Sequence, residues 1–170
     1  MIDKQTFVAQ IDEKSGMLFR VARSILRSTA DCDDALQESV MKAWASRHML
    51  REEKFFATWM TRILIRECRN IQRKQAKYAL EADVEVQTKS EGEMSDTDLH
   101  AAVDALPEKQ RLPLVLHYIE GYALKEIAAM LRLPVTTVRN RLYAARQRLR
   151  LELADESDEQ RKKEAQPYEA

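Results

Sequence analysis

Arginine side chains concentrate in two separate stretches of the chain. Residues 62–77 hold six basic residues and one acid, and residues 132–150 hold six arginines and no acid. Arginine pairs with phosphate through a fixed fork of N–H donors and can also contact base edges. One charged run is usually a solvated helix face, but two runs with helical spacing predict two contacts with a polyanion.

Acidic stretches offset these two basic runs. Residues 31–38 hold four acids and no base, and residues 81–98 hold seven acids and one base. The whole chain has 28 basic and 28 acidic residues, so its formal net charge is 0. A net charge of zero excludes a protein whose whole surface is basic and coats nucleic acid. Charge that is segregated into segments remains compatible with local contacts to DNA.

Other residue types show no spacing typical of catalysis or metal binding. Cys32, Cys68 and the three histidines are scattered, without the short repeats of a zinc site. Cys68 lies on an apolar stripe and is expected to be buried. Because no Gly-rich phosphate loop or nucleophile motif occurs, we expect neither an enzyme nor a cofactor, and no metal site.

Helices must position the charged residues, because the 170 residues include only three Gly and four Pro. We therefore expect an all-α fold. Ser28 is a predicted N-cap, which places the acidic run at a helix start. A further helix is expected from about residue 54 to about residue 77, with Trp59 in the core and the arginines outside.

The second basic run follows a helix-turn-helix pattern. A short helix over 123–131 precedes a tight break at 132–134, and a last helix begins near Thr137. Arg132 lies in this break, and a left-handed arginine there would carry modest strain. The last helix would bury one apolar stripe and expose donors that can reach phosphates and bases.

These patterns predict two small helical domains joined by a flexible acidic linker. The expected ranges are 1–80, a linker over 81–97, 98–153, and a disordered tail over 154–170. If extended, the 17-residue linker would reach roughly 56–61 Å, which exceeds one ~34 Å turn of duplex DNA. No apolar run approaches ~18 residues and no signal peptide is evident, so we expect a cytoplasmic protein without direct membrane insertion.

Two blocks resemble a known family. LPEKQRLPLVLHYIEGYALKEIAAMLRLPVTTVRNRLYAARQRL resembles region 4 of bacterial sigma factors. LFRVARSILRSTADCDDALQESVMKAWASR, followed by FFATWMTRILIRECRNIQRK, resembles region 2. Because the two blocks follow each other across a short linker, the chain resembles the extracytoplasmic-function class and would bind core RNA polymerase and promoter DNA.

The resemblance implies roles for three groups of residues. Core polymerase would be bound by Asp31, Asp34, Gln37 and Glu38. The −10 promoter motif would be melted and read by Trp59, Arg62, Arg66, Arg69, Asn70 and Arg73, with an unstacked base held by the loop over 47–53. The −35 motif would be read by Thr137, Arg139, Asn140, Tyr143 and Arg146. The linker would lie in a basic channel of the polymerase.

Several positions depart from the family pattern. Many relatives have Asn at the position of Arg66 and Asp at the position of Asn70. Asn140 replaces a common Ser and can pair bidentately with adenine, while Ala144 replaces a common DNA contact. We expect these departures to alter the promoter sequence that is recognised, without loss of DNA binding.

Two other functions fit parts of the pattern. A stand-alone helix-turn-helix repressor or activator explains residues 123–150, but not the acidic run beside a basic helix. A helical protein-interaction module needs both arginine stripes to be solvated surface.

The resemblance further implies a membrane-linked anti-sigma factor that binds exposed apolar edges.

Overall fold

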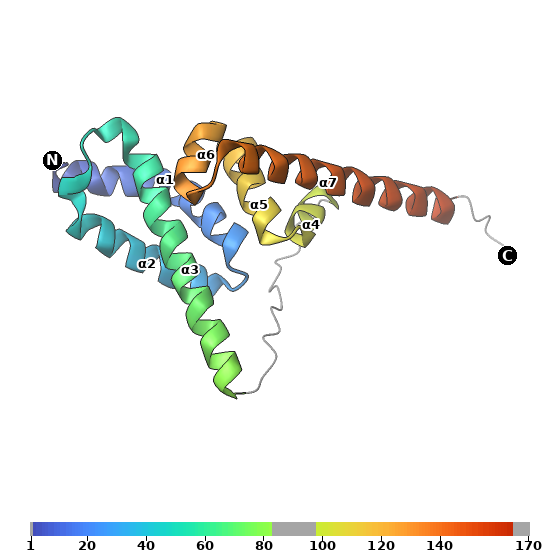
Figure 1. Ribbon diagram of the computed structural model, residues 1–170, viewed down its shortest axis with the longest axis horizontal. Helices are drawn as coiled ribbons and strands as arrows, with labels where there is room; N and C mark the ends of the chain where they lie inside the picture. The colour runs from blue at the N-terminus through green and yellow to red at the C-terminus, as the bar shows by residue number, and fades with distance from the viewer. Residues whose placement is uncertain (1, 83–97, 165–170) are drawn as a thin grey trace.

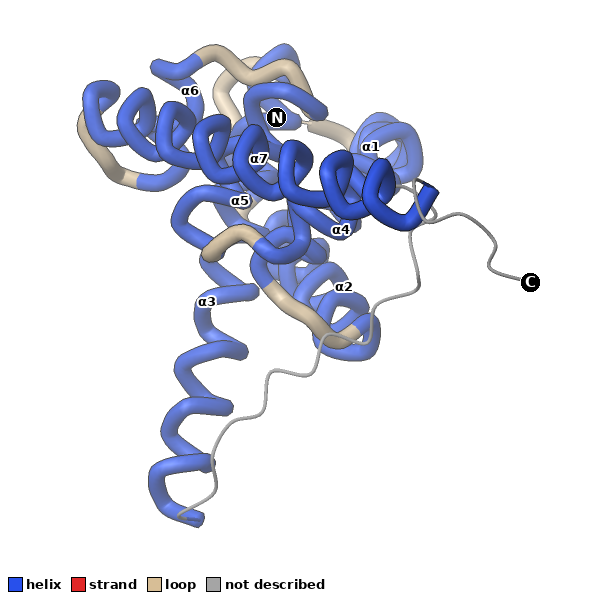
Figure 2. The backbone as a smooth tube through the Cα atoms, turned by 90° about the vertical axis from the view of Figure 1, so that its right-hand side faces the viewer, coloured by secondary structure: helices blue, strands red, loops and turns tan. Residues whose placement is uncertain are grey.

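The computed structural model describes residues 2–82 and 98–164 (Figure 1). Within these ranges the regular elements are all helical and no strand occurs, which confirms the predicted all-α fold (Figure 2). Residues 83–97, most of the predicted linker, lie outside the described residues. No helix of the described part is both long and apolar enough to cross a membrane.

Three long helices make up the N-terminal half. They are α1 (Lys4–Ile25), α2 (Thr29–Ala45) and α3 (Phe56–Ala82), with the short turns η1 (Arg47–Met49) and η2 (Glu53–Phe55) between α2 and α3. The Ser28 hydroxyl accepts a hydrogen bond from the Asp31 amide at 3.3 Å, which confirms the predicted cap. This cap fixes the start of the acidic helix.

The C-terminal half begins with α4 (Asp98–Ala105) and α5 (Glu108–Leu114). A π-helical turn, η3 (Val115–Ile119), continues α5, and Gly121 then turns the chain with φ of 75°. The predicted helix-turn-helix consists of α6 (Leu124–Leu131) and α7 (Val135–Glu164). Arg132 ends α6 with φ of 55° and ψ of 50°, which is the left-handed conformation that is modestly strained for an arginine.

Two element boundaries differ from the sequence expectation. Residues 53–55 form the separate turn η2, so α3 starts at Phe56, and it continues beyond the expected domain end at 80. Helix α7 extends through residue 164, into the range for which composition predicted disorder. Residues 158–164 contain no Gly or Pro, the two residue types that most disfavour a helix.

A cluster of aromatic rings closes the outer end of the N-terminal half. Phe56 is 1% exposed and meets Phe7 edge to face at 5.6 Å between ring centroids. Phe7 in turn contacts Trp44 at 5.2 Å, and Trp59 lies 6.0 Å from Phe56. These rings fix the starts of α1 and α3 relative to the end of α2.

The two halves are packed against each other along α1 and α3. Helix α1 contacts α5, and α3 contacts α6 (Figure 1). The buried side chains of both halves belong to one continuous hydrophobic cluster. The sequence predicted two helical domains but gave no indication of this contact between them.

An ion pair joins α2 to α3 close to the core. The Lys42 ammonium donates to Glu67 at 2.7 Å and also lies 3.0 Å from Glu38. Asn70 donates to the same Glu67 oxygen at 3.0 Å. Burial would raise the pKa of Glu67, but the hydrogen bonds from Lys42 and Asn70 outweigh it and hold this pKa below its usual 4.5.

Replacement of Phe56 by Ala should destabilise the fold by about 3–5 kcal/mol, because it removes a buried ring and leaves a cavity. The neighbouring ring provides a matched control, since Phe55 is 50% exposed. Phe55→Ala should cost about 0.5 kcal/mol or less. Urea unfolding followed by circular dichroism measures both, and equal losses would contradict the assigned core.

Replacement of Glu67 by Gln should lower the free energy of unfolding at pH 7 by roughly 1–3 kcal/mol, since it removes a charged hydrogen-bond acceptor. A carboxylate whose pKa is lower in the folded than in the unfolded state stabilises the folded state. This stabilisation is complete above the unfolded-state pKa and is lost as the pH falls through the folded-state pKa. The difference between wild type and Glu67→Gln should therefore shrink below about pH 4.5. The control Glu38→Gln, at a side chain that is 45% exposed, should change stability little at any pH. A pH-independent difference for Glu67→Gln would rule out this linkage.

Candidate nucleic-acid interface

Helix α3 displays a row of arginines on one face. Arg62, Arg66, Arg69 and Arg73 follow each other at spacings of three and four residues, which places them on one side of an α-helix. The opposite side of α3 carries Met60, Leu64 and Cys68, all of which are buried. Burial of that side fixes the rotation of α3 and so directs the arginines outward.

The arginine row keeps its positive charge available. Among the described residues, no carboxylate lies within 4.0 Å of Arg62, Arg66 or Arg69. Arg73 donates to the Asn70 side chain and to the backbone carbonyl of Arg69. The row therefore remains free to bind an anionic ligand.

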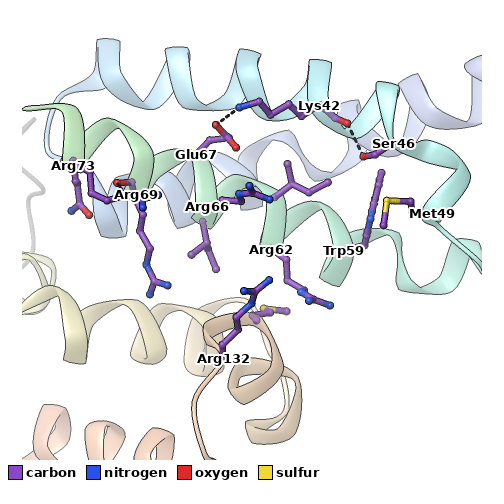
Figure 3. Close-up of a pocket in the computed structure, with 14 residues that line it drawn as sticks. Lys42, Ser46, Met49, Trp59, Arg62, Arg66, Glu67, Arg69, Arg73 and Arg132 are labelled. Atoms are coloured by element: carbon purple, nitrogen blue, oxygen red, sulfur yellow. Dashed lines mark hydrogen bonds and ion pairs between the residues drawn. The ribbon is translucent and has the colours of Figure 1, made fainter.

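The row lines a cleft of about 1190 Å³, here named the arginine cleft (Figure 3). Trp59 and Met49 lie together at one end, and Met49 is 66% exposed in the turn η1. Arg132 points into the cleft from the end of α6, opposite α3. Trp59 is half-buried: its ring packs near Phe56 in the core, and it also forms part of the cleft wall. The sequence predicted only the core position.

A second depression lies between α2 and the other edge of α3, here named the α2–α3 groove. It measures about 850 Å³. Its lining includes the four predicted core-polymerase residues: Asp31, Asp34, Gln37 and Glu38. Asp31 accepts a hydrogen bond from Gln75 of α3 at 2.8 Å. The groove thus presents a set of carboxylates supported by two helices.

The structure separates one residue, Asn70, from the others that the sequence grouped with the −10 site. Asn70 lines the α2–α3 groove and not the arginine cleft, because its amide is held by Glu67. Arg73 lines both depressions, while Trp59, Arg62, Arg66 and Arg69 line the arginine cleft. The two sites therefore lie on adjacent edges of one helix.

The start of α7 carries the predicted −35 residues. Arg139, Asn140, Tyr143 and Arg146 are exposed and Thr137 is half-buried. Val138, Leu142 and Ala145 are buried on the opposite side and anchor the helix to its own half of the molecule. The exposed residues form a polar face that can enter a major groove.

Sequence reasoning missed one partner of this face. The Arg146 guanidinium donates to the Tyr118 hydroxyl at 2.8 Å, from a position 28 residues away in the chain. Tyr118 belongs to the π-helical turn η3, and its ring meets His117 edge to face at 4.8 Å. Nothing in the sequence pattern marked this tyrosine, since the π turn changes which side chains face α7.

No group of three or more His, Cys, Asp or Glu side chains suited to a metal ion occurs in residues 2–82 and 98–164. The two cysteines are buried separately from the charged sites. Burial raises the pKa of Cys32 to about 11 and that of Cys68 to about 12. Both thiols are therefore protonated at neutral pH and behave as small apolar core residues.

Family models match both halves of the chain. Residues 11–78 match Sigma-70 region 2, and residues 96–149 match Sigma-70 region 4. RNA polymerase sigma factor SigV of Bacillus subtilis is 32% identical over 156 residues, covering 90% of this chain and 94% of the relative. ECF RNA polymerase sigma factor SigW of the same organism is 27% identical, covering 90% and 91%.

A solved structure shares the fold. It is the sigma factor RpoE from Bartonella quintana, crystallised with the anti-sigma factor NepR. It has a TM-score of 0.74 and 23% identity, and the match covers 87% of this chain and 96% of that chain. Together with the two helical halves and their charged faces, these matches show that the chain belongs to the extracytoplasmic-function class of RNA polymerase sigma factors.

Proposed function

We propose a division of labour between the three charged surfaces of this sigma factor. The α2–α3 groove binds core RNA polymerase through Asp31, Asp34, Gln37 and Glu38. The arginine cleft holds the separated −10 strand, and the exposed face of α7 reads the −35 element as duplex. The observation that carries this proposal is the arginine row without carboxylate partners in the described part of the chain.

Strand separation explains why an unneutralised arginine row is useful. Taking a base out of the stack costs a few kcal/mol. Guanidinium groups along a groove offset that cost by binding the backbone, and an aromatic ring adds base stacking. Arg62, Arg66 and Arg69 supply the charge, and Trp59 with Met49 supplies an apolar end wall.

The −35 contacts follow from the donors on α7. Arg139 and Arg146 can contact phosphate or guanine, and Asn140 can pair bidentately with adenine. Tyr118 holds Arg146 and so restricts the direction in which that arginine points. The departures at Arg66, Asn140 and Ala144 favour promoter bases that differ from those of many relatives.

Regulation by an anti-sigma factor belongs to the same proposal. The RpoE structure contains the anti-sigma factor NepR. The present chain exposes apolar side chains on both halves, among them Val8, Met41 and Ile119, which offer contacts for such a partner. The chain acts in the cytoplasm and leaves catalysis to the polymerase.

Run-off transcription with purified core RNA polymerase tests the main proposal. Templates come from genomic DNA upstream of transcript 5′ ends mapped after overexpression. Addition of the chain should give initiation at defined positions, whereas core alone should not. Duplex binding by the chain alone, without specific initiation, would instead indicate a repressor or activator.

Arg139→Ala should weaken −35-dependent initiation by about 1–3 kcal/mol if Arg139 contacts a base bidentately. Arg148→Ala is the matched control, because nine residues of helix place Arg148 on the side opposite Arg139. Competition between promoters with intact and altered −35 elements measures the effect. Equal discrimination by Arg139→Ala and wild type would remove Arg139 from the base-reading role.

A further inference from the structure

The arginine cleft is lined by positive charge on two opposite sides. Arg62 and Arg66 reach it from α3, and Arg132 faces them from the end of α6 (Figure 3). Among the described residues, no carboxylate lies within 4.0 Å of these three guanidinium groups. Like charges that face each other repel, so a contact between α3 and α6 brings together groups that disfavour it. An anion between the two helices would convert this repulsion into attraction.

The acid that lines the cleft does not provide this anion. Glu67 accepts hydrogen bonds from Lys42 at 2.7 Å and from Asn70 at 3.0 Å, and its side chain is only 5% exposed. Its carboxylate is therefore engaged on the α2 side of α3. The counter-charge for the facing arginines has to come from a bound ligand.

Arg132 has no part in the proposed contacts with polymerase or promoter, yet its backbone is strained. Its φ of 55° and ψ of 50° lie in the left-handed region that favours glycine. Strained backbone positions are concentrated at functional sites, where the side chain has a use that offsets the strain. Glycine would relieve the strain at this position but would remove the guanidinium that the end of α6 contributes to the cleft.

Positive charge from both halves continues into a neighbouring depression of about 520 Å³. Arg69 of α3 lines this depression as well as the arginine cleft, and Lys109 and Arg141 line it from the C-terminal half. The acid in this lining, Glu108, accepts a hydrogen bond from Gln72 at 2.7 Å. A chain of phosphates thus meets cationic donors from both halves along one path.

The size and the lining of the cleft fit a nucleoside polyphosphate. Its volume of about 1190 Å³ is large enough for a ligand of this size. Trp59 and Met49 form an apolar end, and an aromatic ring offers a stacking surface for a base (Figure 3). Arg62 and Arg66 follow on α3, and guanidinium groups bind phosphate oxygens through paired N–H donors.

We propose that the arginine cleft is a binding site for a nucleoside polyphosphate, held between α3 and the end of α6. The base stacks at Trp59, and the phosphates bind Arg62, Arg66 and Arg132. Because the same α3 arginines are assigned to the −10 strand, the bound ligand excludes that strand from the cleft. This competition rests on the proposed function, whereas the binding of the ligand does not.

Isothermal titration calorimetry on the full chain tests the site, with guanosine triphosphate, inorganic tripolyphosphate and guanosine as separate probes. Guanosine triphosphate should bind about tenfold more tightly than tripolyphosphate, because a stacked base adds to the phosphate contacts. Guanosine alone should show no measurable binding. Equal or tighter binding of tripolyphosphate would overturn the base subsite and assign the cleft to inorganic phosphate chains. Absence of binding by both phosphate compounds at millimolar concentration would overturn the whole site.

Arg132→Gly isolates the contribution of α6. It removes the guanidinium and relieves the left-handed strain, so thermal unfolding should show a fold at least as stable as wild type. Affinity for guanosine triphosphate should fall about tenfold, because a hydrogen bond between charged groups is lost. The matched control Arg148→Ala removes an exposed arginine outside the cleft and should leave this affinity unchanged. Unchanged affinity in Arg132→Gly, or an equal fall in both variants, would overturn the site between α3 and α6.

Competition with a single-stranded −10 oligonucleotide separates this proposal from the proposed function. Guanosine triphosphate should displace the oligonucleotide from wild type, and failure to displace it would overturn the competition. Arg132→Gly should bind the oligonucleotide as tightly as wild type but need about tenfold more nucleotide for displacement, whereas Arg66→Ala should weaken the binding of both. If guanosine triphosphate binds as expected but no form of the chain binds the oligonucleotide, the ligand site is supported and the −10 role of the cleft is refuted.

Discussion

The structure depends on a row of like charges that form no ion pair with the protein's acids in the described part of the chain. Four arginines along α3 repel one another, and only a rigid helix with a buried opposite side keeps them on one face. Glu67, the acid that lines the same cleft, is bound by Lys42 and Asn70. Basic and acidic residues that are grouped separately along the sequence thus form separate charged surfaces in the folded structure.

Helix α3 serves two surfaces at the same time. One edge borders the carboxylates of α2 and the other borders the arginine cleft. Lys42, Glu67 and Arg73 line both depressions, so the polar network that holds α2 against α3 also supports each binding surface. The position of one helix therefore sets the geometry for polymerase and for DNA together.

Sequence patterns predicted the fold class, the Ser28 cap and the exposed face of α7, because these features depend on local spacing and backbone preference. The contact between regions 2 and 4 was not predictable in this way. Arg27 and Arg111 bind backbone carbonyls, and every residue type offers a carbonyl, so no partner residue marks the contact in the sequence. The Asn70 and Tyr118 contacts were missed for a related reason, since both depend on packing between helices.

The burial of both thiols has a consequence for how stress can reach this protein. Peroxides attack the thiolate form of cysteine, and at neutral pH a group with a pKa of about 11 or 12 is almost entirely protonated. The chain contains only these two cysteines, and neither reaches the surface. An oxidative signal that acts on thiols would therefore have to be detected by another molecule and passed to this one through non-covalent association.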